Sequence, residues 1–296
     1  MALPPFREVP DLAAISRDGT SLALFDVQPS GGEFEGGWRS TAALLLVHGA
    51  TADHTTWRAV GPRFAASHMT FAMDRRGRGA SEDREPYSIE REFEDVASAA
   101  EQITRTFDRQ VDVVGHSYGG RCALGASLLT PAIRRVVVYE GAPVPPGLSY
   151  RPPGLVEAVR DALERGDNEG ALTTFLAGIV GMSEAELDAY RANPVWPDRV
   201  AAAHTILREI EAEAGPAASL EALGVATAPV LLLLGSTSRS PFRIGTEALA
   251  ERLAHAEVAV IESAAHAAHH THVDEFARVV EEFLDRPLAE AATIRP

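Results

Sequence analysis

The pentapeptide Gly115-His116-Ser117-Tyr118-Gly119 constrains the fold of this chain more than any other feature, because it directly follows the apolar run Val111 to Val114. The residues after it, Gly120 to Ser127, suit a helix. A sharp turn from strand to helix needs small residues around its centre, since larger side chains would collide with neighbouring backbone. Such a turn exposes the Ser117 hydroxyl at the end of a sheet and places the next N–H at a helix N-terminus. We therefore predict a nucleophilic serine, with a structural glycine turn as the alternative.

Six short, almost wholly apolar runs predict strands that are buried on both faces. They are Ala42–Val47, Met69–Met73, Val111–Val114, Val136–Tyr139, Val230–Leu234 and Val258–Ile261. Helical stretches separate most of them, including Glu90–Thr106 and Thr271–Leu284, the second with Thr271 and Asp274 as a predicted capping pair. This alternation is typical of an α/β fold with a doubly wound, mostly parallel β-sheet flanked by helices. A hairpin over Leu12 to Val27 and a glycine-rich loop over Gly31 to Trp38 are predicted before it.

One region interrupts the alternation. From Ala142 to about Pro216 no buried strand is predicted, and a proline-rich entry leads into helical segments, one of which begins with the capping-box pattern Ser183 to Glu186. Both ends of the region return to the same predicted sheet. We therefore expect a core domain of residues 1–141 and 217–296, with residues 142–216 inserted as a helical cap over one end of the sheet. A separate helical domain is the alternative.

Composition and charge exclude several classes of partner. The formal net charge is −15 at pH 7, which disfavours nucleic acid and anionic membranes. The longest apolar runs are too short to span a bilayer, and the N-terminal residues lack the pattern of a signal peptide. The single cysteine, Cys122, allows no intrachain disulfide. We expect a soluble cytoplasmic protein.

A nucleophilic serine needs hydrogen-bond donors for the oxyanion that it creates. The segment Leu46 to Thr51 leaves a predicted strand and enters a loop, in which Gly49 allows the backbone to approach a ligand closely. The N–H groups of Ala50 and Tyr118 are the predicted donors of an oxyanion hole. A plain glycine at a strand end is the alternative.

The serine also needs a base on a loop after a late strand. His266 directly follows the last predicted strand and is our candidate. His269, His270 and His272 give the same segment the look of a metal site, but no Cys or carboxylate stands at ligand spacing, so we expect no metal.

These motifs together resemble the α/β-hydrolase fold superfamily, in its branch of serine ester hydrolases and cofactor-free haloperoxidase-like enzymes. The motifs are the His48-Gly49 loop, the segment Asp74 to Ser81, the Gly115–Gly119 turn and His266, and they occur in the family's order over about Leu12 to Leu284. The resemblance implies that Asp74 is structural, that residues 142–216 are the cap that shapes the substrate pocket, and that no cofactor is required.

The acid of the expected triad departs from the family's pattern. The loop after the strand that follows the cap often carries an Asp, but here Gly235 to Phe242 holds no carboxylate. Three explanations remain: the acid is missing, with Thr237 or Ser238 orienting the histidine; another loop supplies it; or it is Glu140, at the end of the strand before the cap. Haloalkane dehalogenases and zearalenone-type lactonases place their acid there. We favour Glu140, because the imidazole of His266 would give its buried charge a partner.

The predicted function is a serine hydrolase that cleaves a small-molecule ester or lactone through an acyl-enzyme on Ser117, with His266 as base and Glu140 as acid. A non-hydrolytic enzyme of the same fold (a perhydrolase, acyltransferase or carbon–carbon lyase) and a ligand receptor with slow turnover are the alternatives. The candidate pocket residues are Gly49, His54, Trp57 and Trp196. For the aromatic residues among them, packing in the core is at least as good an interpretation as contact with a ligand.

Overall fold

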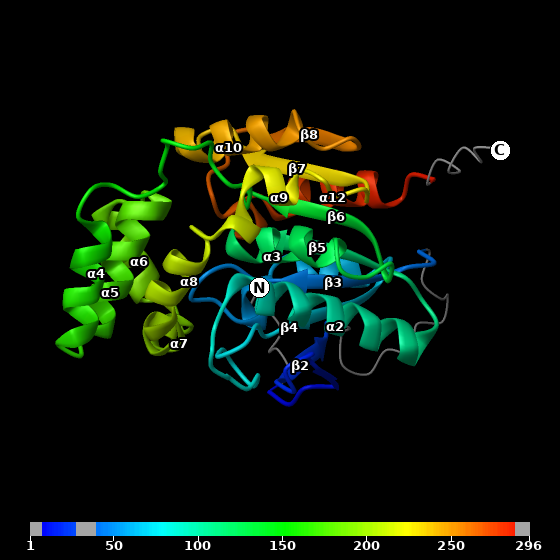
Figure 1. Ribbon diagram of the computed structural model, residues 1–296, viewed down its shortest axis with the longest axis horizontal. Coiled ribbons are helices and arrows are strands. Elements are labelled where there is room, and N and C mark those ends of the chain that lie inside the picture. The colour runs from blue at the N-terminus through cyan, green and yellow to red at the C-terminus, as the bar shows by residue number, and fades with distance from the viewer. Residues whose placement is uncertain (1–7, 28–39, 288–296) are drawn as a thin grey trace.

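The structure is a computed structural model that describes residues 8–27 and 40–287. Within these residues, eight strands form one sheet in the order β1-β2-β4-β3-β5-β6-β7-β8 (Figure 1). The first two pairings, β1 with β2 and β2 with β4, are antiparallel, and the other neighbouring strands run parallel. The predicted α/β architecture with a mostly parallel sheet is confirmed. The predicted loop over Gly31 to Trp38 lies outside the described residues.

The strands are β1 (Leu12–Ile15), β2 (Ser21–Asp26), β3 (Ala43–Val47), β4 (Met69–Met73), β5 (Val111–His116), β6 (Ile133–Tyr139), β7 (Val230–Gly235) and β8 (Ala256–Ile261). The helices of the core are α1 (Gly61–Ala65), α2 (Ile89–Phe107), α3 (Tyr118–Ser127), α9 (Leu220–Leu223), α10 (Ser240–Ala250), α11 (Ala268–Thr271) and α12 (Val273–Leu284), with the short 3-10 turn η1 (His54–Trp57).

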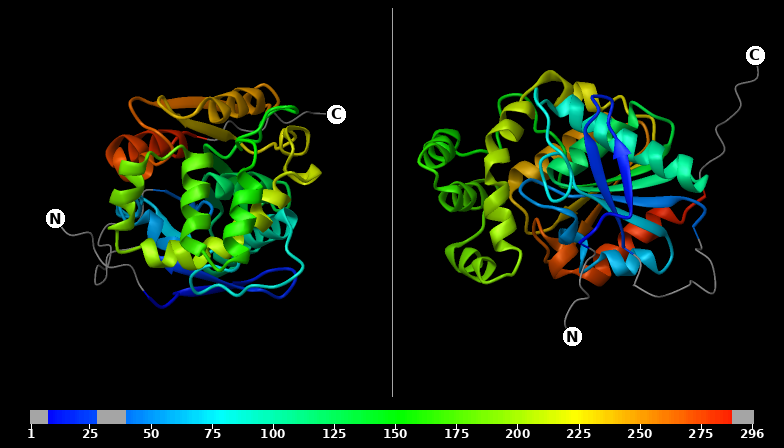
Figure 2. Two further views of the ribbon diagram at one scale, coloured as in Figure 1. Left: turned by 90° about the vertical axis from the view of Figure 1, so that its left-hand side faces the viewer. Right: turned by 90° about the horizontal axis from the view of Figure 1, so that it is seen from below.

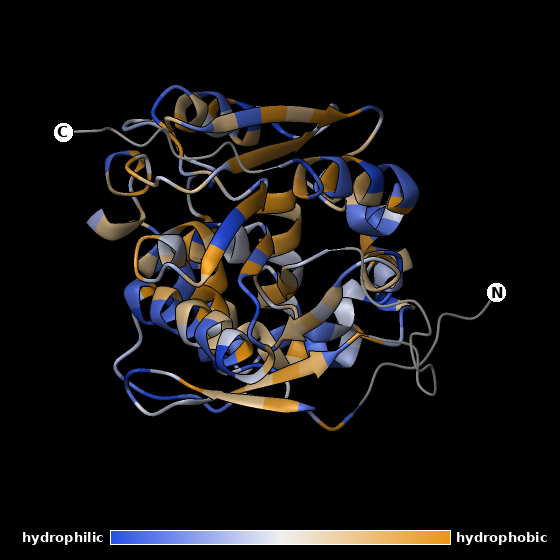
Figure 3. Ribbon diagram, turned by 90° about the vertical axis from the view of Figure 1, so that its right-hand side faces the viewer, coloured by the Kyte–Doolittle hydropathy of each residue, from blue (hydrophilic) through white to orange (hydrophobic). Residues whose placement is uncertain are grey.

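The central strands are buried on both faces because a layer of helices covers each face. In β3, Leu45 packs into a cluster with α2, α3 and α10, whereas Leu44 and Leu46 pack into a second cluster with α1 and α12. This alternation follows from the two-residue period of a strand. Figure 3 shows the result, with mainly apolar strands inside and polar residues on the outer sides of the helices.

The last strand differs from its prediction. β8 lies at the edge of the sheet and pairs with β7 alone. Val258 is 49% exposed and Val260 is 44% exposed, so the expectation that Val258–Ile261 is buried on both faces is wrong. An apolar run indicates that a segment favours a strand. The position of that strand in the sheet decides how many of its faces are covered.

The predicted capping pair of the C-terminal helix is also wrong. Thr271 ends the short helix α11, and its hydroxyl donates to the carbonyl of Ala267 at 3.2 Å. Residue His272 precedes α12 without a side-chain capping bond. The other predicted cap is confirmed, because Ser183 and Glu186 form a reciprocal capping box at the start of α6.

The region between β6 and β7 is helical, as predicted, and it lies beside the sheet at the carboxyl ends of the parallel strands (Figures 1 and 2). Its elements are α4 (Leu155–Glu164), α5 (Asn168–Phe175), the π-helical turn η2 (Leu176–Val180), α6 (Glu184–Arg191), α7 (Trp196–Ala201), η3 (Ala202–Thr205), α8 (Ile206–Ala212) and η4 (Pro216–Ala218). We call residues 142–216 the cap. Its helices enclose a small apolar cluster of their own. Among the described residues, no helix is both long and apolar enough to cross a membrane.

Candidate active site

Ser117 occupies the sharp turn between β5 and α3, in a backbone conformation that a residue with a side chain rarely adopts (φ 53°, ψ −123°). The glycines around it are required by close approach. A Cβ on Gly115 would lie 2.5 Å from the carbonyl oxygen of Gly119, and a Cβ on Gly119 would collide with the carbonyl oxygen of His48. A strained serine that the surrounding packing holds in place is typical of a functional turn.

Glu140 lies directly after β6, is 2% exposed, and also has a positive φ of 51°. Its Oε2 contacts Nδ1 of His266 at 2.6 Å. Its Oε1 accepts the N–H of Gly235 at 2.8 Å and the hydroxyl of Ser238 at 2.5 Å. A buried carboxylate with this many donors is fixed in place. The loop after β7, which holds no carboxylate, therefore supplies donors to the carboxylate of β6.

The two polar residues of that loop do not orient the imidazole directly. Thr237 donates its hydroxyl to the carbonyl of Ala264 at 2.8 Å, and Ser238 donates to Glu140. The base candidate is instead held from two other sides. The ring of Phe242 stacks on His266 with centroids 4.4 Å apart, and Nε2 of His116 contacts the carbonyl of His266 at 2.8 Å.

His116 therefore connects the serine turn to the histidine loop, since it is the residue before Ser117. Burial, with a smaller contribution from His266, lowers the pKa of His116 well below its ordinary value. The ring is thus neutral and donates Nε2–H to the carbonyl. No hydrogen bond joins Ser117 Oγ to the His266 imidazole among the residues described; catalytic contacts of this kind are often long before a substrate binds.

The loop that carries Ala50 is fixed by a buried arginine. Arg75 Nη1 donates to the carbonyl of Gly49 at 3.2 Å and, more weakly, to that of His48 at 3.4 Å. In a trans peptide the C=O and the N–H point in opposite directions. By holding the Gly49 carbonyl, Arg75 turns the Ala50 N–H the opposite way, and Ala50 lines the pocket that contains Ser117.

Arg75 is itself held by carboxylates from the core and from the cap. Its Nη2 lies 2.6 Å from Glu92 on α2 and 2.6 Å from Glu209 on α8. Arg78 forms a second ion pair with Glu209. Burial raises the pKa of Glu92, but the charges of Arg75 and Arg78 outweigh it and bring that pKa to about 2. This buried network connects the cap to the backbone beside the serine.

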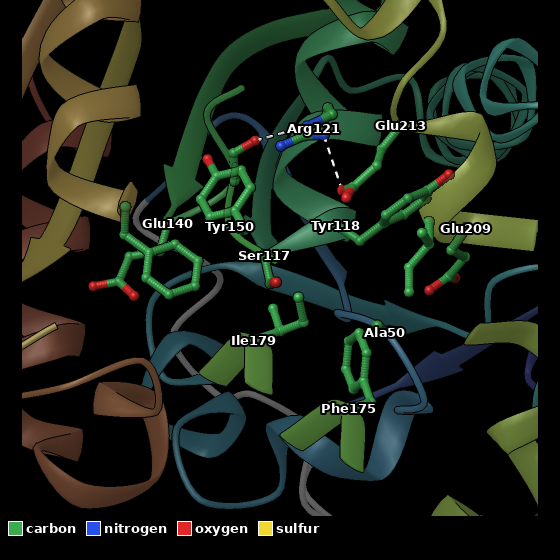
Figure 4. A pocket seen from close by; sticks show the side chains of 13 residues that line it. Ala50, Ser117, Tyr118, Arg121, Glu140, Tyr150, Phe175, Ile179, Glu209 and Glu213 are labelled. Carbon is green, nitrogen blue, oxygen red and sulfur yellow. Dashed lines mark hydrogen bonds and ion pairs between the residues drawn. The ribbon is translucent and has the colours of Figure 1, made fainter. Parts of the chain in front are cut away.

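A narrow pocket with a free volume of about 40 Å³ lies between core and cap (Figure 4). Its lining is mostly apolar and comes from both sides: Ala50, Ser117, Tyr118, Arg121, Glu140, Gly141, Tyr150, Phe175, Ile179, Glu209, Ile210, Glu213 and Phe242. In Figure 4, Ser117 lies between Glu140 on one side and Ala50 and Tyr118 on the other, with Phe175 and Ile179 of the cap nearby. The candidate nucleophile therefore opens into a pocket that core and cap form together.

Sequence reasoning missed Arg121, which lines this pocket one helical turn after Ser117. It donates to the carbonyls of Gly141 and Ala142 at 3.1 and 3.3 Å and to Glu213 at 3.1 Å (Figure 4). The spacing of four residues on one helix face was a signal that could have found it. Phe175 and Ile179 gave no such signal, because they reach the pocket through the packing of the cap.

The four suggested pocket residues lie elsewhere than in the lining of this pocket. Gly49 lies beneath Ser117, so that a Cβ on it would lie 3.2 Å from the serine Cβ. His54 contacts Asp74 through Nδ1 at 2.8 Å, and Trp57 is fully buried in the second core cluster. Trp196 packs edge-on against Tyr190 inside the cap.

Asp74 and His48 form structural hydrogen bonds. Asp74 accepts the N–H groups of His54 at 2.8 Å and Ala80 at 2.9 Å, which ties two loops together. His48 accepts the N–H of Arg75 at 3.0 Å. Among the residues that the structure describes, no group of three or more His, Cys, Asp or Glu side chains is arranged to hold a metal ion.

A model of the alpha/beta hydrolase family matches residues 44–279. The chain is 27% identical over 270 residues to a pimeloyl-[acyl-carrier protein] methyl ester esterase of Neisseria meningitidis, an alignment that covers 83% of this chain and 78% of that protein. A crystal structure of an alpha/beta hydrolase from Sphaerobacter thermophilus has a TM-score of 0.74 and 26% identity, and covers 92% of this chain and 99% of that one. The enol-lactonase from Burkholderia xenovorans has a TM-score of 0.71 over 93% of this chain and all of its own, but at 18% identity it is evidence of the fold alone.

Proposed function

Because this chain belongs to the alpha/beta hydrolase family, we propose that it is a serine hydrolase that cleaves a small-molecule carboxylic ester or lactone through an acyl-enzyme on Ser117. The relatives include esterases, which supports a hydrolase of this class. The observation that carries the proposal is the hydrogen bond between Glu140 and His266 beside the strained serine turn. It brings together a nucleophile, an acid and a base that follow β5, β6 and β8, three parallel strands of one sheet.

The proposed reaction begins with attack of Ser117 Oγ on the carbonyl carbon. Nδ1 of His266 faces Glu140, so Nε2 is the nitrogen that takes the serine proton. Glu140 fixes this tautomer and stabilises the imidazolium. The N–H groups of Ala50 and Tyr118 hold the oxyanion, His266 returns the proton to the leaving alkoxide, and water then releases the acyl group by the same route in reverse.

The cap enters the proposal as the part that selects the substrate. Residues of the cap, among them Phe175, Ile179 and Ile210, form the apolar wall of the pocket opposite Ser117. An apolar wall favours the hydrocarbon part of an acyl group and excludes water. A cytoplasmic location, expected from the sequence, belongs to the same proposal, as does independence from cofactors.

Labelling of the serine tests the proposal. Incubation with a p-nitrophenyl phosphonate, followed by intact-mass measurement, should add one phosphonyl group to the wild type, and peptide mapping should place it on Ser117. Ser117→Ala should remain unlabelled, whereas Ser127→Ala, ten residues along the same helix, should label normally. A panel of p-nitrophenyl esters and lactones then measures turnover. A wild-type protein that neither labels nor turns over any ester would refute the assignment.

A further inference from the structure

Arg199 is a buried cation without an acidic partner. It lies on α7 of the cap and is 3% exposed. Its Nη1 donates to the carbonyl of Thr51 at 3.1 Å, and its Nε is buried without a hydrogen-bond partner. Within residues 8–27 and 40–287, no Asp or Glu forms an ion pair with it.

The other buried arginines are compensated. Arg75, Arg76, Arg78 and Arg121 each form an ion pair with a carboxylate. Arg135, which has none in the described part of the chain, donates Nη1 and Nη2 to the carbonyls of Leu284 and Arg286. Arg199 is different, because one main-chain contact serves a group with five N–H donors. A buried charge left in this state is unfavourable unless an anion binds to it.

Its position connects it to the candidate active site. Thr51 follows Ala50, which lines the pocket and carries a proposed oxyanion donor. Thr51 has a positive φ of 55°, so the chain turns sharply at the residue that Arg199 contacts. Burial is the main cause of the low pKa values of His48 and His116, and the positive charge of Arg199 contributes to both. The guanidinium therefore contacts the residue next to one that lines the pocket.

We propose that Arg199 binds a carboxylate carried by the substrate at the end remote from the scissile ester. The substrate class is then the half-ester of a dicarboxylic acid, or a lactone with a free carboxylate. The guanidinium fork matches a carboxylate bidentately, and its hydrogen bonds to an anion are charge-assisted. The ester carbonyl would lie at Ser117 while the carboxylate replaces the acidic partner that Arg199 lacks. This inference rests on the proposed function.

Two esters that differ at one end, where one has a free carboxylate and the other a methyl ester, test the proposed role of Arg199. We expect wild type to hydrolyse monomethyl glutarate with a kcat/KM about 10- to 100-fold above that of dimethyl glutarate, because hydrogen bonds to a charged group are worth this much. Arg199→Gln should remove the preference, because kcat/KM for the half-ester falls further than kcat/KM for the diester. Arg199→Lys should keep part of it, since a point charge remains without the fork.

Arg191→Gln is the matched control. Arg191 also lies in the cap, but it is exposed and pairs with Asp188 and Glu169, so its removal changes net charge equally without touching the Thr51 loop. It should preserve the preference. If Arg199→Gln does not fold, the preference of wild type for the half-ester and its partial loss in Arg199→Lys test the proposal instead. Equal kcat/KM for both esters in wild type, or a preference that survives Arg199→Gln, overturns the proposal.

A binding measurement separates this inference from the proposed function. Titration calorimetry with glutarate, which has no ester to cleave, should give binding to wild type that weakens about 10-fold or more in Arg199→Gln. Glutaramide, which is uncharged, should bind weakly to both. Glutarate binding without turnover of any ester would retain the anion site and reject the hydrolase. Ester turnover without glutarate binding would retain the hydrolase and reject the anion site.

Discussion

The carboxylate of Glu140 lies 2.6 Å from Nδ1 of His266, although 126 residues separate them in the chain. The two residues follow β6 and β8, and β7 lies between those strands. The loop after β7 occupies the gap and donates to the same carboxylate from Gly235 and Ser238. Glu140 is thus bound on both oxygens before any substrate arrives, and the imidazole has one nitrogen left for the serine.

Replacing Glu140 with glutamine removes the negative charge beside His266 and keeps the shape of the side chain. We expect Glu140→Gln to lower kcat for p-nitrophenyl acetate by about 1,000-fold or more, because the amide cannot hold the required tautomer or stabilise the imidazolium. Thr237→Ala should leave kcat nearly intact, since Thr237 bonds the carbonyl of Ala264. Ser238→Ala, which removes one donor to Glu140, should cost no more than about 10-fold. Stopped-flow and steady-state assays measure all three. Near-normal turnover by Glu140→Gln would remove Glu140 from the triad.

Arg75 should affect turnover without touching the substrate. Arg75→Lys keeps the charge but cannot reach Gly49, Glu92 and Glu209 at once. The Gly49 carbonyl then loses one of its two side-chain donors, the other being Nδ1 of His48 at 2.8 Å, and we expect kcat to fall about 10-fold with little change in KM. Arg76→Lys is the matched control, because Arg76 pairs with Asp95 and Asp18 and does not contact this loop. Equal losses in both variants would contradict an effect on the oxyanion donor.

The depressed pKa of Glu92 predicts how stability depends on pH. The pKa of Glu92 in the folded protein is about 2, against an ordinary value of 4.5 for a glutamate side chain. A lowered carboxyl pKa contributes stability that is fully present above the unfolded value and is lost as pH falls toward the folded value. Urea unfolding should therefore show wild type losing stability between about pH 5 and pH 2 more steeply than Glu92→Gln. Near neutral pH, Glu92→Gln should be less stable by about 3 kcal/mol.

The half-buried neighbour Glu94, which pairs with Arg91 on the same helix, gives the comparison for this pH experiment. Glu94→Gln should change the free energy of unfolding by less than about 0.5 kcal/mol, as surface pairs contribute little. Parallel pH curves for wild type and Glu92→Gln would show that the buried network does not hold the Glu92 charge.

The strained backbone of Ser117 should lower the free energy of unfolding. A glycine adopts positive φ freely, so Ser117→Gly is expected to raise the free energy of unfolding by about 1 kcal/mol while it abolishes turnover. Ser127→Gly, at the end of α3, should have the opposite sign and destabilise by about 0.5 kcal/mol. Thermal and urea unfolding measure both. A Ser117→Gly variant less stable than wild type would mean that the serine conformation carries no net strain.

The sheet and the three candidate catalytic residues were accessible from sequence for one reason. Parallel strands place their carboxyl ends along one edge, so residues that directly follow strands come together whatever their separation in the chain. This rule identified Ser117, Glu140 and His266 as neighbours. The same rule could not identify Val258 and Val260 as exposed, because an apolar run does not indicate whether its strand lies at the edge of the sheet.

The wall of the pocket was beyond such reasoning. Helical periodicity in the cap predicts which face of each helix is apolar, but not which helix is nearest the serine. Phe175 and Ile179 reach the pocket where α5 widens into the π-helical turn η2, and nothing in their spacing marks that widening. Trp196, in contrast, has the side chain expected of a ligand-binding residue and packs inside the cap.

The acid and the first residues of the cap share one short stretch of chain. Glu140 is followed at once by Gly141 and Ala142, whose carbonyls Arg121 holds, and Tyr150 donates a hydrogen bond to Ala142 as well. A protein engineer who exchanges caps between relatives would therefore have to place the splice junction after Ala142. Joined there, a foreign cap could bring a new substrate preference while the hydrogen bond between Glu140 and His266 beneath it keeps its own alignment.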